Sequence, residues 1–109
     1  MNTRSAKAKG RRLQQTVRDL ILKKFKDLQE DDVRSTSMGT GGEDIQLSPK
    51  AREKFPFSIE CKNTESLNVW KMMEQAEANS KGHIPLGVFK RNGSKCYCVL
   101  DLNDFLNLL

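Results

Sequence analysis

The fold of this chain is decided by the stretch Phe57-Ser58-Ile59-Glu60-Cys61-Lys62. Apolar and polar side chains alternate along it and Pro56 precedes it, so the pattern predicts a β-strand. Side chains of a strand point alternately to its two faces, which puts Ser58, Glu60 and Lys62 together on one face. Burying a lone charge in such a strand is costly unless the charge has a partner. We therefore expect the face with Glu60 and Lys62 to line a reaction centre.

The 109 residues, 37% hydrophobic and 30% charged, indicate one small globular domain. No run of about 18 apolar residues occurs, so we expect no membrane segment, and no apolar stretch that would indicate a signal peptide follows the first residues. The three cysteines, Cys61, Cys96 and Cys98, are odd in number and are expected in the core of a protein kept in a reducing, cytoplasmic compartment. A zinc site is disfavoured because His83 is the one obvious further ligand.

Positive charge is concentrated at the start of the chain. Residues 1–26 hold nine Lys and Arg residues and a single acid, Asp19, whereas the whole chain has a net charge of +5. This asymmetry predicts a polyanionic partner, with nucleic acid as the first candidate and Lys9, Arg11 and Arg12 as contacts. A basic tail that only aids solubility is the alternative.

Hydrophobic periodicity and turn residues predict the remaining elements. Residues 1–10 are expected to be a disordered basic arm, and residues 11–109 a single domain. The expected elements are a helix over 11–28, strands over 33–36 and 43–47, a helical turn over 48–54, the strand over 57–62, a helix over 66–79, a hairpin of strands over 84–89 and 95–100, and a last helix over 104–109. This order predicts an α/β fold with a central mixed sheet flanked by helices.

Several segments leave alternatives open. The glycine-rich loop over 37–42 is either a phosphate-binding loop or a connector. The apolar helix over 104–109 either docks on the core or supplies a dimer contact. Trp70 is expected in the core rather than as a surface for base stacking, and His83 is expected at the surface or as a helix cap rather than as a general base.

Asp44 and Glu60 come from two strands that we expect to be antiparallel neighbours, so their side chains converge on one polar face. Two adjacent carboxylates repel each other unless a cation lies between them. Mg²⁺ takes oxygen ligands and keeps several waters, and the carbonyl oxygen of Cys61 is a possible third ligand. Lys62 then stabilises negative charge at phosphorus, a set suited to phosphodiester hydrolysis. An exposed ion pair on an edge strand is the alternative.

These residues, with Gln75 on the following helix, resemble the motif of the PD-(D/E)XK nuclease superfamily. The stretch over 33–39 that leads to Asp44 more narrowly resembles the archaeal-type Holliday junction resolvases and their small phage relatives, and the resemblance covers roughly residues 10–109. It implies a restriction-endonuclease-like αβββαβ core and a homodimeric endonuclease that uses Mg²⁺, or Mn²⁺ in its place, to cut branched DNA. A phage-encoded protein of this kind works in the host cytoplasm.

The resemblance also implies roles for individual residues. Asp44 and Glu60 become metal ligands, Lys62 the catalytic lysine, and Gln75 a residue that positions the lysine or the attacking water. Contacts to the DNA backbone are implied for Arg34, Ser35 and Ser37.

The chain departs from the family pattern at two places. Glu43 replaces a proline, and Gln14 or Gln15 replaces a first-helix glutamate. The competing functions are an inactive DNA-binding module and a nuclease acting on nicks, ends or linear duplex.

Overall fold

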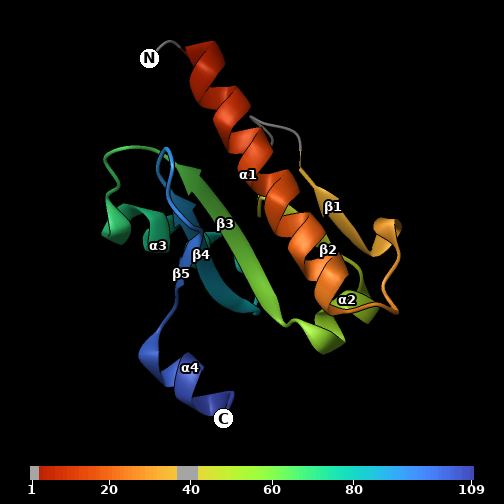
Figure 1. Cartoon of the computed structure of the whole chain (residues 1–109). Coiled ribbons are helices and arrows are strands. Elements are labelled where there is room, and N and C mark those ends of the chain that lie inside the picture. The colour runs from red at the N-terminus through yellow and green to blue at the C-terminus, as the bar shows by residue number, and fades with distance from the viewer. Residues whose placement is uncertain (1–2, 37–41) are drawn as a thin grey trace.

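The computed structural model describes residues 3–36 and 42–109 (Figure 1). In chain order the elements are α1 (Thr3–Lys24), a short 3-10 helix (Glu30–Asp32), β1 (Val33–Ser35), β2 (Ile45–Leu47), α2 (Pro49–Lys54), β3 (Phe57–Asn63), α3 (Val69–Ala78), β4 (Ile84–Lys90), β5 (Tyr97–Val99) and α4 (Leu102–Asn107). The predicted α/β class, a mixed sheet flanked by helices, is confirmed.

The five strands lie in sequence order, β1-β2-β3-β4-β5. Neighbouring strands are antiparallel except β3 and β4, which run parallel because α3 carries the chain back between them. Ile45 of β2 pairs with Ile59 of β3, which confirms the predicted antiparallel neighbours. The strand that decides the fold therefore lies in the middle of the sheet, with both edges paired.

Helices cover both faces of β3. On one face Ile59 and Cys61 pack in a core with Leu13, Val17 and Ile21 of α1. On the other face α3 packs against β3 and β4. The close approach of α3 depends on Gly87 of β4, where a Cβ atom would lie 2.6 Å from Cε of Met72. Since the middle of β3 is covered on both faces, its polar side chains Ser58 and Glu60 are buried too.

Helix α1 is longer at its start than predicted. It begins at Thr3, so the predicted disordered arm over 1–10 is wrong for residues 3–10. The segment holds Ala6, Lys7 and Ala8, which are strong helix formers, and they extend a helix whose next turns pack on the sheet. The basic residues of this segment therefore stand on a helix with a defined spacing.

Capping residues and a turn glycine mark the ends of several other elements. Ser48 caps α2 by accepting a hydrogen bond from the Ala51 N–H at 3.1 Å, and Asp101 caps α4 by accepting the Asp104 N–H at 3.0 Å. Helix α3 starts later than predicted because Asn68, not Ser66, accepts the Lys71 N–H. Gly93, with φ +76°, forms the predicted turn between β4 and β5.

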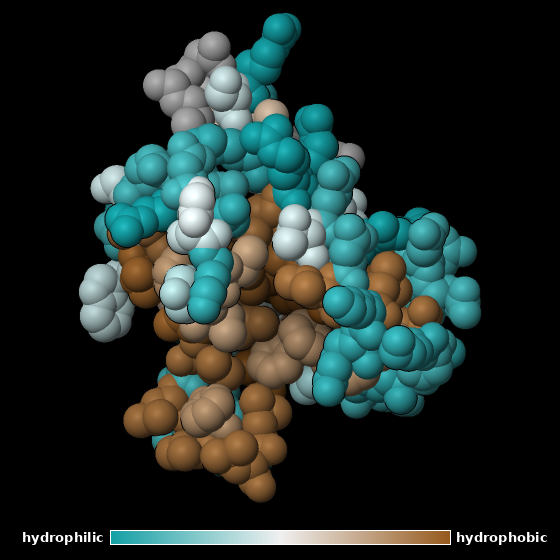
Figure 2. Space-filling view, in the orientation of Figure 1, coloured by the Kyte–Doolittle hydropathy of each residue, from teal (hydrophilic) through white to brown (hydrophobic). Residues whose placement is uncertain are grey.

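Helix α4 projects from the end of the sheet and buries none of its residues (Figure 1). Its apolar side chains form a knob, which we call the α4 knob (Figure 2). Their exposed fractions range from 46% to 91%; the residues are Leu102, Phe105, Leu106, Leu108 and Leu109. None of the helices within residues 3–36 and 42–109 has the length and apolar character that a membrane crossing needs.

Candidate active site

Asp44 is clamped between β1 and β3. Its backbone N–H donates to the carbonyl oxygen of Ile59 at 2.9 Å, and its carbonyl oxygen accepts the Thr36 N–H at 2.9 Å. Its side-chain Oδ2 accepts the backbone N–H of Cys61 at 2.7 Å. These three bonds turn the Asp44 carboxylate toward the middle of β3, next to Glu60.

Glu60 is a buried acid, with only 2% of its surface exposed. Its side chain interacts directly with the carboxyl group of Asp44, and Oε2 is buried with no hydrogen-bond partner among the described residues. Burial, followed by the charge of Asp44, raises the pKa of Glu60 to about 7, against an ordinary value of 4.5. Burial also raises the pKa of Asp44. Both carboxyl groups therefore hold their protons to higher pH than isolated carboxyl groups do.

Lys62 lies on the same face of β3, two residues beyond Glu60, and is half-buried. Its positive charge lowers the pKa of both Asp44 and Glu60, so it acts on the two acids together. No salt bridge within 4 Å joins it to either acid in the described chain. Asp44 and Glu60 are thus in contact, and Lys62 lies close enough for its charge to act on both acids.

Few side chains near the acidic pair are placed to bind a cation. Within residues 3–36 and 42–109, no group of three or more His, Cys, Asp and Glu side chains is placed to hold a metal. Two buried carboxyl groups, one with an unpartnered oxygen, nevertheless fit Mg²⁺, which uses one or two carboxylates and fills its other positions with water and phosphate. The carbonyl oxygen of Cys61 stays a predicted third ligand.

Glu43, next to Asp44, does not join this pair. Its carboxylate forms a half-buried ion pair with Arg52 of α2. Arg52 also donates to the carbonyl oxygen of Phe57 at 2.9 Å, so this pair ties the start of β2 to the start of β3. The residue in the place of the family's proline thus has a structural partner of its own.

The amide that lies against Glu60 belongs to Asn79, whereas the resemblance implies that Gln75 positions Lys62 or the attacking water. Gln75 is exposed on α3, and no contact of its side chain with Asp44, Glu60 or Lys62 occurs in the described part of the chain. Asn79, at the end of α3, lies against Glu60 and lowers its pKa, and its carbonyl oxygen accepts from Ser58 at 3.4 Å. Sequence reasoning missed Asn79, although its spacing of one helical turn from Gln75 puts the two on one side of the helix.

Of the two glutamines considered in place of a glutamate, Gln14 is buried and Gln15 is exposed. Gln14 Oε1 accepts the hydroxyl proton of Ser35 at 2.7 Å. The hydroxyl proton of Ser35 is therefore directed to α1 rather than to a ligand, which counts against the predicted phosphate contact. Ser37 lies outside the described residues.

The basic candidates separate into surface and interior groups. Arg11 and Arg12 are exposed on α1, and Arg11 shares a shallow surface pocket with Arg4 and Lys7. The Lys9 ammonium group is buried with no hydrogen-bond partner in the described part, contrary to its predicted role as a surface contact. Arg34 is exposed and forms an ion pair with Asp31 at 3.2 Å.

The start of α1 lies near the end of β3 that carries Lys62. The Asn63 amide donates to the carbonyl oxygen of Lys9 at 3.5 Å, and the first turns of α1 extend beyond the sheet on that side (Figure 1). The exposed arginines of α1 thus stand close to the end of β3 that carries Lys62. Positive charge at this end of the sheet favours a polyanionic partner there.

The remaining predictions have mixed outcomes. Trp70 is 82% exposed, so its predicted place in the core is wrong, because the buried side of α3 is formed by Met72 and Ala76. Among the described residues all three cysteines are unpaired, but only Cys61 is buried, so the core prediction fails for Cys98. His83 is half-buried in the turn before β4, where its backbone N–H donates to the carbonyl oxygen of Ser80.

No protein-family model, curated protein or solved structure gives a significant match to this chain.

Proposed function

We propose that this protein is a divalent-metal-dependent DNA endonuclease with a restriction-endonuclease-like core. The observation that carries the proposal is the buried contact between the carboxyl groups of Asp44 and Glu60, with Lys62 on the same face of β3. The element order helix, three strands, helix, strand, with the short α2 inserted before β3, supports the same assignment.

Asp44 and Glu60 would hold the cation, which supplies Lewis acidity toward a phosphate and lowers the pKa of a coordinated water. A bound cation would favour the ionised form of both carboxyl groups. Lys62 stabilises the negative charge that develops on the phosphate as it is attacked. The exposed arginines at the start of α1 bind the DNA backbone without reading its sequence.

Branched DNA is the proposed substrate, and a homodimer the proposed active form, because two symmetric cuts need two acidic pairs in one assembly. An inactive DNA-binding module is the competing function. The pairing of both acids with Lys62 argues against it, because a module that only binds a polyanion gains nothing from two buried carboxyl groups.

The test uses a labelled four-way junction, a nicked duplex and a linear duplex, each incubated with Mg²⁺ and with EDTA. We expect Mg²⁺-dependent cleavage, strongest on the junction. Glu60→Gln should abolish cleavage and leave DNA binding largely intact, whereas Glu53→Gln, at an exposed position of α2, should leave cleavage unchanged. Equal cleavage by Glu60→Gln and the parent would refute the site, and binding without cleavage by the parent would favour the inactive module.

A further inference from the structure

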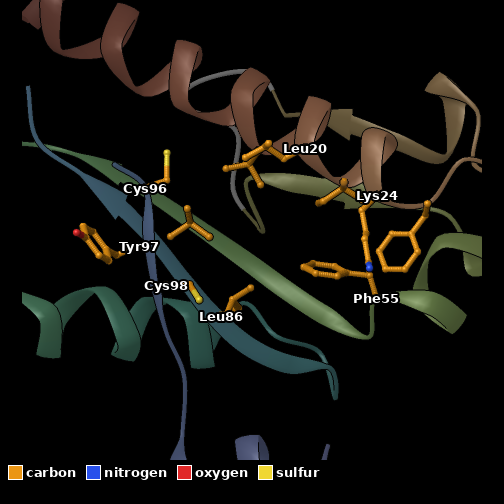
Figure 3. A pocket seen from close by; sticks show the side chains of 11 residues that line it. Leu20, Lys24, Phe55, Leu86, Cys96, Tyr97 and Cys98 are labelled. Carbon is orange, nitrogen blue, oxygen red and sulfur yellow. The ribbon is translucent and has the colours of Figure 1, made fainter. Parts of the chain in front are cut away.

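Apolar surface lies uncovered at the α4 knob and at a groove beside it. The groove lies between α1 and the β4–β5 edge of the sheet and has a volume of about 420 Å³ (Figure 3). Its walls include Leu20 of α1, Leu86 of β4, Cys98 of β5 and Phe55, which follows α2. It passes into the knob as one apolar surface on the face shown in Figure 2.

This surface is larger than a monomer usually leaves in water. About half or more of each large side chain of the α4 knob is exposed. If each buries roughly 150 Å² when fully covered, the knob alone presents on the order of 500 Å². Monomeric proteins rarely expose contiguous apolar patches beyond a few hundred Å². The knob and the groove together therefore need an occupant.

We propose that α4 of one chain docks in the groove of a second copy, and that the exchange is reciprocal. Each chain has one knob and one groove, so a two-fold arrangement satisfies both surfaces and closes without forming a fibre. Two such contacts cover both knobs, on the order of 1,000 Å², which together with the groove walls reaches the lower end of the range for a specific interface.

The connection to α4 argues against the chain filling its own groove. Only Leu100 and Asp101 separate β5 from α4, and this short link holds the helix out beyond the end of β5. Two residues span roughly 7 Å at most, whereas the groove runs back along β5 and α1. A partner's α4 reaches the groove with no change in either chain.

Charge is complementary as well. Lys24 is the one charged residue among those that line the groove in the described structure. The segment over 101–109 carries two acids, Asp101 and Asp104, and no basic residue. An acidic helix entering a groove with a lysine at its rim gains attraction, whereas two knobs packed against each other bring like charges together.

The test is sedimentation equilibrium of the full chain and of two variants with matched exposure, Leu106→Asp in the knob and Leu20→Asp in the groove, each 53% exposed in the parent. The parent should be a dimer at about 100 µM, and each variant should weaken association by about 100-fold or more. Trp70→Asp, on the exposed side of α3, should leave the association unchanged. Circular dichroism establishes that each variant is folded.

Mixing the two variants gives the decisive result. Leu106→Asp keeps an intact groove and Leu20→Asp an intact knob, so an equimolar mixture should form a heterodimer through one contact, weaker than the parent dimer. A monomeric parent would overturn the proposal, and so would a monomer whose own α4 fills its groove. A Leu20→Asp dimer as tight as the parent would overturn it too, because the knob would then pack elsewhere.

Discussion

The side chain of Asp44 accepts the backbone N–H of Cys61 at 2.7 Å, which fixes the carboxylate of the residue before β2 beside the middle of β3. The neighbour it meets there is Glu60, with an exposed fraction of 2%. Two acids held this way carry an electrostatic cost when both are ionised, and a cation is the simplest way to remove it.

Glu60→Gln should stabilise the metal-free protein at alkaline pH. The pKa of Glu60 is about 7 in the folded chain and about 4.5 in the unfolded chain, so the folded state binds more protons between these values. Its contribution is therefore favourable below pH 4.5 and is lost as the pH rises through 7. At about 1.4 kcal/mol per pKa unit, the loss is on the order of 3 kcal/mol.

The measurement is urea unfolding of the parent and Glu60→Gln at pH 5 and pH 8, with EDTA present. The variant should be the more stable at pH 8, and the difference should shrink at pH 5. Comparing the two proteins cancels the opposite contribution of Asp27 and Asp32, whose pKa values are lowered by hydrogen bonds. A difference independent of pH would contradict the shifted titration of Glu60.

Asn79 and Gln75 should differ in their effects on the pH dependence of cleavage. Asn79 lowers the pKa of Glu60, so Asn79→Ala should raise that pKa and move the acidic limb of the rate profile to higher pH. Gln75→Ala leaves the contacts of Glu60 unchanged and should leave the limb in place. A shift with Gln75→Ala alone would restore the role that the family resemblance implies.

Lys62→Met should reduce the rate of cleavage without weakening the binding of metal or DNA. Lys62 acts on the reacting phosphate rather than as a ligand, so we expect a loss of about 10²–10³-fold in single-turnover rate. Lys71→Met, at an exposed position of α3, is the matched control. Equal loss of rate in both variants would indicate a nonspecific effect of charge.

Arg11→Gln combined with Arg12→Gln should weaken DNA binding and flatten its salt dependence. Each phosphate contact contributes about 0.9 to the slope of log K against log salt, so the double variant should lower its magnitude by about 2. Lys23→Gln, exposed in the last turn of α1, should have little effect. An unchanged slope would remove the start of α1 from the interface.

Alternation along residues 57–62 was enough to predict a buried strand with Glu60 and Lys62 on one face, because a period of two is a direct consequence of strand geometry. The antiparallel pairing that brings Asp44 to it followed from the short connection through α2. These parts of the site depend on local geometry, which a sequence pattern expresses well.

The sequence pattern of α3 does not determine which side of the helix is buried. Its apolar residues permit more than one buried side, and the contact of Met72 with Gly87 selects the side with Met72 and Ala76. Trp70, two residues from Met72, is then turned outward, and Asn79 rather than Gln75 meets Glu60. Tertiary packing between distant residues makes that choice.

Direct binding of Mn²⁺ at pH 8, followed by electron paramagnetic resonance, tests the central claim most closely, since it needs neither DNA nor cleavage. We predict one bound ion per chain, lost in Asp44→Asn and in Glu60→Gln and retained in Glu53→Gln. Undiminished binding in both acid variants, or no binding by the parent, would contradict the claim that these two buried carboxyl groups hold a divalent cation.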